Sequence, residues 1–164
     1  MIPVVSIVGK SEVGKTTLLE KVIRELKSRG YRVATVKHDA HSFDIDHPGK
    51  DTWRHAQAGS DHVVIASPAR IAHIQRIERE LTLPEIAATI DDADIILTEG
   101  YKRGPALKIE VSRAEKGREL LCTREELVAL ATDQPFDLDV PQFGLDDAKG
   151  LVNLIVQKFL TKDE

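Results

Sequence analysis

The chain has 164 residues, of which 41% are hydrophobic and 30% charged, and this length and composition are typical of a soluble globular protein with one domain. Its net charge of −4 argues against a nucleic-acid partner, because no basic field would attract a phosphate backbone. The single cysteine suits a reducing cytosol, and the apolar run at 2–8 is too short to cross a membrane. We therefore expect one cytoplasmic domain over residues 1–164.

Strands and helices are expected to alternate along the chain. The run 2–8 is apolar, β-branched and followed by a glycine, as a buried parallel strand would be. A helix with one apolar face follows over 15–29 and stops at Gly30. Further strands are predicted at 31–37, 62–66, 93–98 and 127–131, and further helices at 52–58, 84–90 and 147–160, the last capped by Asp146. The alternation favours an α/β fold whose mostly parallel sheet is flanked by helices.

Two segments depart from this rhythm. Residues 69–77 and 106–111 alternate apolar and polar side chains, so we expect half-exposed strands that form antiparallel edges. Residues 39–50 are polar, rich in His and Asp, and include Pro48-Gly49, a composition that predicts a mobile loop.

A phosphate-binding motif lies between the first predicted strand and the first predicted helix. The segment Gly9-Lys10-Ser11-Glu12-Val13-Gly14-Lys15-Thr16 matches G-x-x-x-x-G-K-[ST] without a mismatch, and Thr17 follows it. Glycines allow a tight turn whose N–H groups surround an anion, Lys15 supplies a cation for the β- and γ-phosphates, and the Thr16 hydroxyl can ligate magnesium. In this context a plain glycine-rich turn is disfavoured, and the motif predicts a single P-loop NTPase domain.

Acidic residues follow two of the predicted strands. Glu99 ends the strand at 93–98, at the edge of the sheet where ligands of α/β proteins bind. It is the candidate acid for the magnesium shell, directly or through water; an ordinary solvent-facing acid is the alternative. Asp39 and Asp51 lie where P-loop proteins place their switch regions, and are candidates for the metal shell or for orienting a water.

Five of the six histidines fall between residues 38 and 62, a density that suggests a transition-metal site. No pair has the H-x-x-x-H spacing of a helical site, and no cysteine lies nearby. The spacing therefore disfavours a metal other than magnesium. These histidines are His38, His41, His47, His55 and His62.

Four segments together resemble the MobB family: the loop at 9–17, V-K-H-D at 36–39, the segment 51–59 that opens D-T-W-R-H, and T-E-G-Y-K at 98–102. MobB proteins assist the attachment of a guanine nucleotide to molybdopterin. The resemblance implies a GTP-binding adapter of the SIMIBI-like branch of P-loop proteins, dimeric and at most a slow GTPase when alone. Its expected partners are the molybdopterin guanylyltransferase and the molybdenum-insertase machinery.

By position, the resemblance assigns the binding of phosphate and Mg²⁺ to Gly14, Lys15, Thr16 and Thr17. It gives Glu99 the role of the Walker-B acid and Asp51 a switch contact. GTP is implied by the resemblance alone, because the chain has no N-K-x-D motif to read guanine. Asp133, after the last predicted strand, stands in about the right place to read a base. A simple turn explains Asp133 equally well.

We also expect a homodimer whose nucleotide sites lie near the subunit interface. The alternating segments 69–77 and 106–111 would leave an edge or face uncovered, and two-fold pairing is the commonest way to cover it. Lys10 occupies the loop position where some SIMIBI relatives place a lysine on the phosphates of the partner subunit. A solvated loop lysine is the favoured alternative, because exposed lysines are common.

Two other classes of protein remain open. A small-molecule kinase would use the same phosphate loop, with Arg113, Arg118 and Arg124 as a lid, although these arginines flank no clear helical segment. A GTPase that inserts nickel or zinc would use the histidines, but the usual Cys and His spacing is missing.

Overall fold

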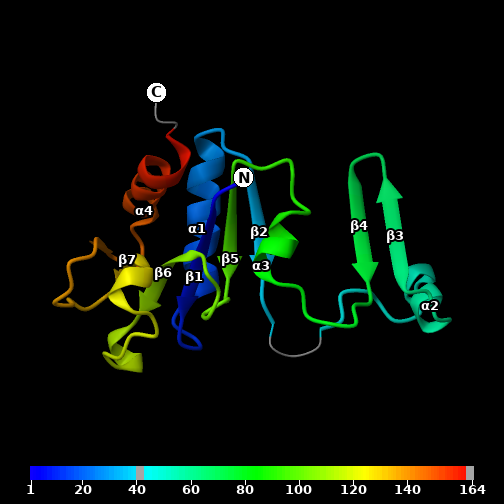
Figure 1. Cartoon of the computed structure of the whole chain (residues 1–164), viewed down its shortest axis with the longest axis horizontal. Helices are drawn as coiled ribbons and strands as arrows, with labels where there is room; N and C mark the ends of the chain where they lie inside the picture. Colours follow the sequence, from blue (N-terminus) through cyan, green and yellow to red (C-terminus); the bar gives the residue numbers. More distant parts are fainter. Residues whose placement is uncertain (40–42, 162–164) are drawn as a thin grey trace. The chain divides into compact units, whose positions relative to one another are not determined.

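A computed structural model describes residues 1–39 and 43–161 of the chain, which divides into two compact units (Figure 1). The first unit contains residues 1–38 and 83–164, and the second contains residues 39–82. A parallel sheet with helices and a separate antiparallel sheet confirm the predicted α/β class. One domain over the whole chain stays a prediction.

The first unit is built on a six-stranded sheet in which every neighbouring pair of strands is parallel, in the order β2-β5-β1-β6-β7-β8. Because all strands run the same way, their carboxyl ends lie along one edge. The phosphate loop leaves that edge from the central strand β1. The strands are β1 (Val4–Gly9), β2 (Val33–Lys37), β5 (Ile95–Glu99), β6 (Leu107–Ser112), β7 (Leu127–Thr132) and the short β8 (Gln142–Phe143), which the sequence did not predict.

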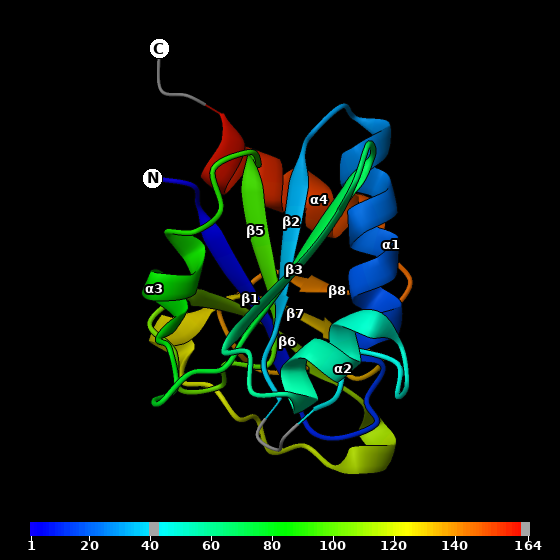
Figure 2. The ribbon, with the colours of Figure 1, turned by 90° about the vertical axis from the view of Figure 1, so that its right-hand side faces the viewer.

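Helices cover this sheet. Helices α1 (Lys15–Ser28) and α4 (Ala148–Ile155) pack on each other, and α4 continues as a π-helical turn, η3 (Val156–Leu160). The short helix α3 (Leu83–Ala87) lies on the other side of β5 and β2 from α1 (Figure 2). The apolar face of α1 meets the fully buried Val5 and Ile7 of β1 in the main core, whose burial is the chief driving force for folding this unit.

The two main helices end and begin through local chemistry. Gly30 adopts φ +89° just after α1, the left-handed conformation expected of a helix stop. The predicted cap of α4 is wrong by one residue, because Asp147 accepts the bond from the Gly150 N–H at 2.8 Å. Asp146 instead pairs with Lys21 on α1. Of the two adjacent aspartates, Asp146 therefore links the start of α4 to α1, and Asp147 caps α4.

The expected half-exposed edge strand at 106–111 is wrong. Strand β6 lies between β1 and β7, and its polar side chains Lys108 and Glu110 are each only 1% exposed. Lys108 Nζ donates to Gly104 O at 2.9 Å and to Glu126 at 2.8 Å. Glu110 accepts from the backbone N–H groups of residues 121 and 122. Because loops supply partners for both charges, the alternating pattern is compatible with complete burial.

The second unit consists of α2 (Asp51–Gln57) and the antiparallel hairpin of β3 (His62–Ser67) and β4 (Arg70–Gln75). Both the helix at 52–58 and an antiparallel strand within 69–77 are confirmed. The expectation of a buried strand at 62–66 is wrong, since Val63 is the one buried residue of β3. The exposed apolar residues of the hairpin include Val64 (48%), Ile65 (54%) and Ile71 (64%). A hairpin of two strands has too little surface to cover both of its own faces.

Residues 43–50 contain no helix or strand, in line with the predicted loop, and a turn falls at Pro48-Gly49. Its mobility stays a prediction. Residues 40–42, with His41, lie outside the described residues.

Candidate functional site

The phosphate loop joins the carboxyl end of β1 to the first residue of α1. Its first glycine, Gly9, has φ +152°, and a Cβ there would lie 2.5 Å from the carbonyl oxygen of Val111. Gly14 has φ +94° directly before the helix, so both glycines are required by the backbone. The helix start directs its free N–H groups and positive dipole end to the loop, an arrangement that favours an anion.

Thr16 and Glu99 meet beside this loop. The Thr16 hydroxyl donates to Glu99 Oε1 at 2.8 Å. Glu99 ends β5, which pairs with β1 in a register that sets Glu99 beside Ile7. A hydroxyl and a carboxylate are oxygen ligands of the kind that magnesium prefers, so these two residues fit an Mg²⁺ ion.

Gly100 turns the chain away from the site directly after Glu99. It has φ +100°, and an added Cβ would lie 3.2 Å from the Cβ of His38. The ring of His38 lies 4.7 Å from that of Tyr101, so the ends of β2 and β5 pack together here. This packing holds Glu99 at the carboxyl edge.

Lys15 bends over the phosphate loop. Its Nζ donates to the carbonyl oxygen of Lys10 at 2.7 Å. Burial lowers the pKa of Lys15 below its ordinary value, the charges of Lys102 and Lys37 lower this pKa further, and Glu99 opposes the change. Lys15, Lys37 and Lys102 therefore lie close enough to act on one another beside Glu99, and this local surplus of positive charge suits a polyanion. The predicted roles did not include Lys37 and Lys102, although both stand in the K-H-D and T-E-G-Y-K segments.

The other loop residues have neighbours within the chain. Lys10 Nζ donates to the carbonyl oxygen of Lys116 at 2.9 Å, and Glu12 pairs with Lys116 Nζ at 3.1 Å. The side chain of Val13 is buried in the core, so only its backbone can serve a ligand. Ser11 and Thr17 are exposed. The role of Lys10 on a partner's phosphates stays a prediction.

Asp133 follows β7 at the same carboxyl edge. Its Oδ1 accepts from the backbone N–H of Ala114 at 2.8 Å. A cavity of about 390 Å³ lies beside it, open at the ends of β7 and β8. The cavity is lined by Thr132, Asp133, Gln134, Pro135, Gln142, Phe143 and Gly144.

The three arginines suggested for a kinase lid each have partners within the first unit. Arg113 Nε donates to the carbonyl oxygen of Val13 at 2.8 Å. Arg118 donates to Pro135 O at 2.6 Å, and Arg124 lies 3.9 Å from a carboxylate oxygen of Asp139. Arg113 therefore packs against the phosphate loop itself, a contact that no sequence signal indicated.

Asp39 and Asp51 belong to the second unit, where Asp51 opens α2. Their roles at the metal and at the switch stay predictions. Within residues 1–39 and 43–161, no three His, Cys, Asp or Glu side chains gather into a metal site. In the same residues no helix has both the length and the apolar character needed to span a membrane.

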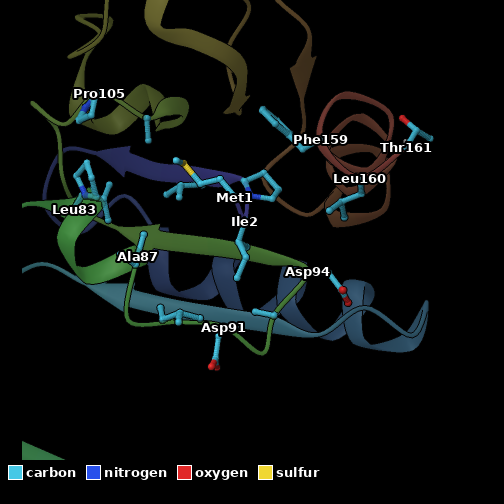
Figure 3. Close-up of a pocket in the computed structure, with 17 residues that line it drawn as sticks. Met1, Ile2, Leu83, Ala87, Asp91, Asp94, Pro105, Phe159, Leu160 and Thr161 are labelled. Atoms are coloured by element: carbon cyan, nitrogen blue, oxygen red, sulfur yellow. The ribbon is translucent and has the colours of Figure 1, made fainter. Parts of the chain in front are cut away.

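A larger cavity of about 890 Å³ lies at the opposite edge of the sheet, where the strands begin (Figure 3). Leu83 and Ala87 of α3, the amino-terminal Met1 and Ile2, and Phe159 border it. Its lining is mostly apolar and includes none of the predicted site residues, so it does not resemble a nucleotide site.

A glycine-bounded phosphate loop between a central parallel strand and a helix, with an acid on the adjacent strand, defines the class of P-loop proteins. Within this class, the profile of the family described as "Molybdopterin guanine dinucleotide synthesis protein B", MobB, matches residues 4–133. The chain belongs to the MobB family, which confirms the resemblance found in the motifs.

Individual relatives agree with this assignment. The chain is 39% identical to a molybdopterin-guanine dinucleotide biosynthesis adapter protein of Haemophilus influenzae, over 84% of this chain and 79% of that protein. It is 37% identical to the adapter protein of that name from Escherichia coli, over 96% and 93% of the two chains. A crystal structure of molybdopterin-guanine biosynthesis protein B (mobB) is 30% identical, with a TM-score of 0.73 over 94% of this chain and 98% of that one. A Bacillus subtilis MobB structure, 24% identical, has the same fold, with a TM-score of 0.75 over 99% and 100% of the two chains.

Proposed function

We propose that this protein is an adapter in the biosynthesis of molybdopterin guanine dinucleotide and that it binds magnesium-GTP at the loop of residues 9–17. The observation that carries the nucleotide site is the 2.8 Å contact between Thr16 and Glu99 beside the loop. The family and the names of the relatives support an adapter over a small-molecule kinase or a metal-inserting GTPase.

The proposed ligand contacts follow from the donors at the carboxyl edge. Gly14 and Thr17 contribute to the phosphate cradle, and Lys15 binds the β- and γ-phosphates. Thr16 and Glu99 hold Mg²⁺, which, when bound, offsets the negative charge of the phosphates. Asp39 in the metal shell and Asp51 as a switch contact are the proposed contributions of the second unit.

Hydrolysis of GTP by this protein is proposed to be slow or dependent on a partner. Efficient P-loop GTPases orient the attacking water with a glutamine and stabilise the transition state with an arginine. In the described part of the first unit, Arg113 is occupied by the carbonyl oxygen of Val13. Turnover by the isolated protein should therefore stay below about 1 per second. The proposed partners are the molybdopterin guanylyltransferase and the molybdenum-insertase machinery, in the cytoplasm.

Asp133 is the proposed contact for the guanine base. It borders the cavity of about 390 Å³ at the end of β7, and one of its carboxylate oxygens is engaged by Ala114. A carboxylate oxygen can accept from the N–H groups of guanine, which adenine does not present in the same place. A calorimetric comparison of GTP with ATP tests this contact.

A homodimer is the proposed working unit. In the described residues β3 and β4 pair only with each other, so both have a free edge, and the hairpin exposes Val64, Ile65 and Ile71. Free edges and apolar faces favour association with a second copy. Light scattering at micromolar protein, with and without magnesium-GTP, tests this: a mass near 18 kDa in both conditions would exclude the dimer.

The adapter function is tested by reconstitution. Purified guanylyltransferase, molybdopterin and magnesium-GTP are combined with the wild-type protein, with Lys15→Ala, or with no addition, and the dinucleotide formed is measured. We expect the wild type to increase product formation and Lys15→Ala to increase it less. Equal product formation in all three reactions would overturn the adapter function, and failure of the wild type to bind magnesium-GTP in calorimetry would overturn the nucleotide site.

A further inference from the structure

Residues 113–118 follow β6 and include the short helix η1 (Ala114–Lys116); we call them the bridging segment. Three bonds join the bridging segment to the phosphate loop. Arg113 Nε donates to Val13 O at 2.8 Å, and Lys10 Nζ donates to Lys116 O at 2.9 Å. Lys116 Nζ lies 3.1 Å from a carboxylate oxygen of Glu12. The loop backbone at Val13 and the charged side chains of Lys10 and Glu12 are thus in contact with this one segment.

The other side of the bridging segment is bound to the turn after β7. Asp133 Oδ1 accepts from the Ala114 N–H at 2.8 Å, Gln134 Nε2 donates to Gly117 O at 3.1 Å, and Arg118 donates to Pro135 O at 2.6 Å. This turn is itself fixed, because the buried Thr132 hydroxyl bonds both the N–H and the carbonyl of Gln134. The turn after β7 therefore anchors the bridging segment to the sheet.

The contact from Arg113 bears on the orientation of a loop N–H group. No peptide bond in the described residues is cis, so the Val13 carbonyl and the Gly14 N–H of one peptide unit point in opposite directions. Arg113 holds that carbonyl on its own side, and its guanidinium would lie 3.3 Å from a Cβ at Gly14. Fixing the carbonyl therefore fixes the Gly14 N–H on the side away from Arg113, as a preorganised anion donor must be.

We propose that Asp133 is a positioning residue for the phosphate loop: by holding Ala114 it fixes Arg113, which in turn sets the Val13–Gly14 peptide for binding the phosphates. This role rests on the proposed nucleotide site and is distinct from reading the base. A base reader affects only ligands that have a base, whereas a positioning residue affects every ligand that has the phosphates. The hydrogen bond from the Ala114 N–H to the Asp133 carboxylate is charge-assisted, and such bonds are stronger than those between neutral groups.

The proposal is tested by calorimetry with magnesium-GTP and magnesium-tripolyphosphate. We expect Asp133→Ala to weaken the binding of tripolyphosphate about tenfold, the usual value of one hydrogen bond to a charged group. The binding of GTP should weaken at least as much, because GTP also loses the proposed base contact. Asp133→Asn should retain most of the affinity for both, because its amide oxygen still accepts from Ala114. Asp137→Ala is the matched control, an exposed aspartate in the same loop without a hydrogen bond or ion pair among the described residues.

A second variant separates positioning from general damage to the fold. Arg113→Ala should lower tripolyphosphate affinity by a similar factor, and the double variant should lose little more than either single variant, because both act through one contact chain. Without ligand, the unfolding midpoints of Asp133→Ala and Arg113→Ala should match the unfolding midpoint of Asp137→Ala. Strictly multiplicative losses in the double variant would contradict the chain of contacts.

Two further outcomes overturn the inference alone: unchanged tripolyphosphate affinity in Asp133→Ala, or loss of GTP affinity without loss of tripolyphosphate affinity. Failure of the wild type to bind either magnesium-GTP or tripolyphosphate would instead overturn the proposed nucleotide site.

Discussion

The six-stranded sheet and the β3–β4 hairpin contain the same kinds of residue and bury them very differently. In β1 and β5, Val5 and Leu97 are fully buried between helices and neighbouring strands. In the hairpin, Ile65 and Ile71 expose more than half of their surface. The sheet has helices packed over it, whereas in the described residues the hairpin strands pair only with each other and the contact of α2 with β3 leaves Ile65 and Ile71 exposed. Apolar β-branched sequence thus builds a rigid support for the phosphate loop in one unit and a surface available for contact in the other.

The largest predicted effect follows from this difference in burial. Leu97→Ala should lower the free energy of unfolding by about 2–5 kcal/mol, because it leaves a cavity in the closed core. In the single chain Ile65→Ala should change it by less than about 0.5 kcal/mol, because the side chain is already half in water. Urea denaturation at a protein concentration low enough to keep the chain monomeric measures both values. A loss for Ile65→Ala as large as that for Leu97→Ala would contradict the exposure of the hairpin in the single chain.

Lys15→Ala tests the function of the supported loop. We expect the affinity for magnesium-GTP to fall by about 2–4 kcal/mol, because a charge-assisted contact in a partly buried site is lost. Lys27→Ala is the matched control, since Lys27 is an exposed lysine on the same helix. Equal calorimetric affinities for the wild type and Lys15→Ala would contradict the assignment of the phosphates to this loop.

Glu99→Gln should change the magnesium dependence more than the affinity for the nucleotide itself. The amide keeps an oxygen beside Thr16 and loses the negative charge that attracts the cation. We expect the magnesium concentration for half-maximal GTP binding to rise about tenfold, in the range found for altered metal surroundings. A magnesium titration at fixed GTP measures it, and an unchanged midpoint would assign Glu99 to structure only.

The smallest expected effect concerns the surface pair between Asp146 and Lys21. The hydrogen bond and charge of Lys21 hold the pKa of Asp146 below its ordinary value of 3.8. Because the folded-state pKa is lowered, the pair stabilises the fold above about pH 4 and this stabilisation is lost as the pH falls through the lowered value. Asp146→Asn should therefore be slightly less stable than the wild type at pH 7, and the difference should be smaller at pH 3. Urea midpoints at both pH values test this, with Asp137→Asn as the control.

Much of the fold was predictable because its signals are local. The first helix and its glycine stop, the α2 helix and the buried strand at 127–131 were expected within a few residues of their observed bounds. Strand β6 was misjudged because alternation shows which side chains are polar and does not show what they meet. Lys108 finds its partners at Gly104 and Glu126, which no periodic pattern can indicate. The hairpin strand at 62–66 was misjudged for the converse reason: an apolar run does not reveal how much of it other elements bury, and in the described residues only Val63 of β3 is buried.

By itself, the sequence determined that this protein has a phosphate loop, because the spacing of Gly9, Gly14, Lys15 and Thr16 is a local backbone requirement that few other uses satisfy. It also pointed to the MobB family, because this loop occurs together with V-K-H-D at 36–39 and T-E-G-Y-K at 98–102. Only the tertiary structure decided that Glu99 meets Thr16, that Arg113 holds the loop from behind, and that Asp133 is bonded to Ala114. These contacts join residues 19 to 100 positions apart, so they exist only once parallel strands have brought their carboxyl ends to one edge.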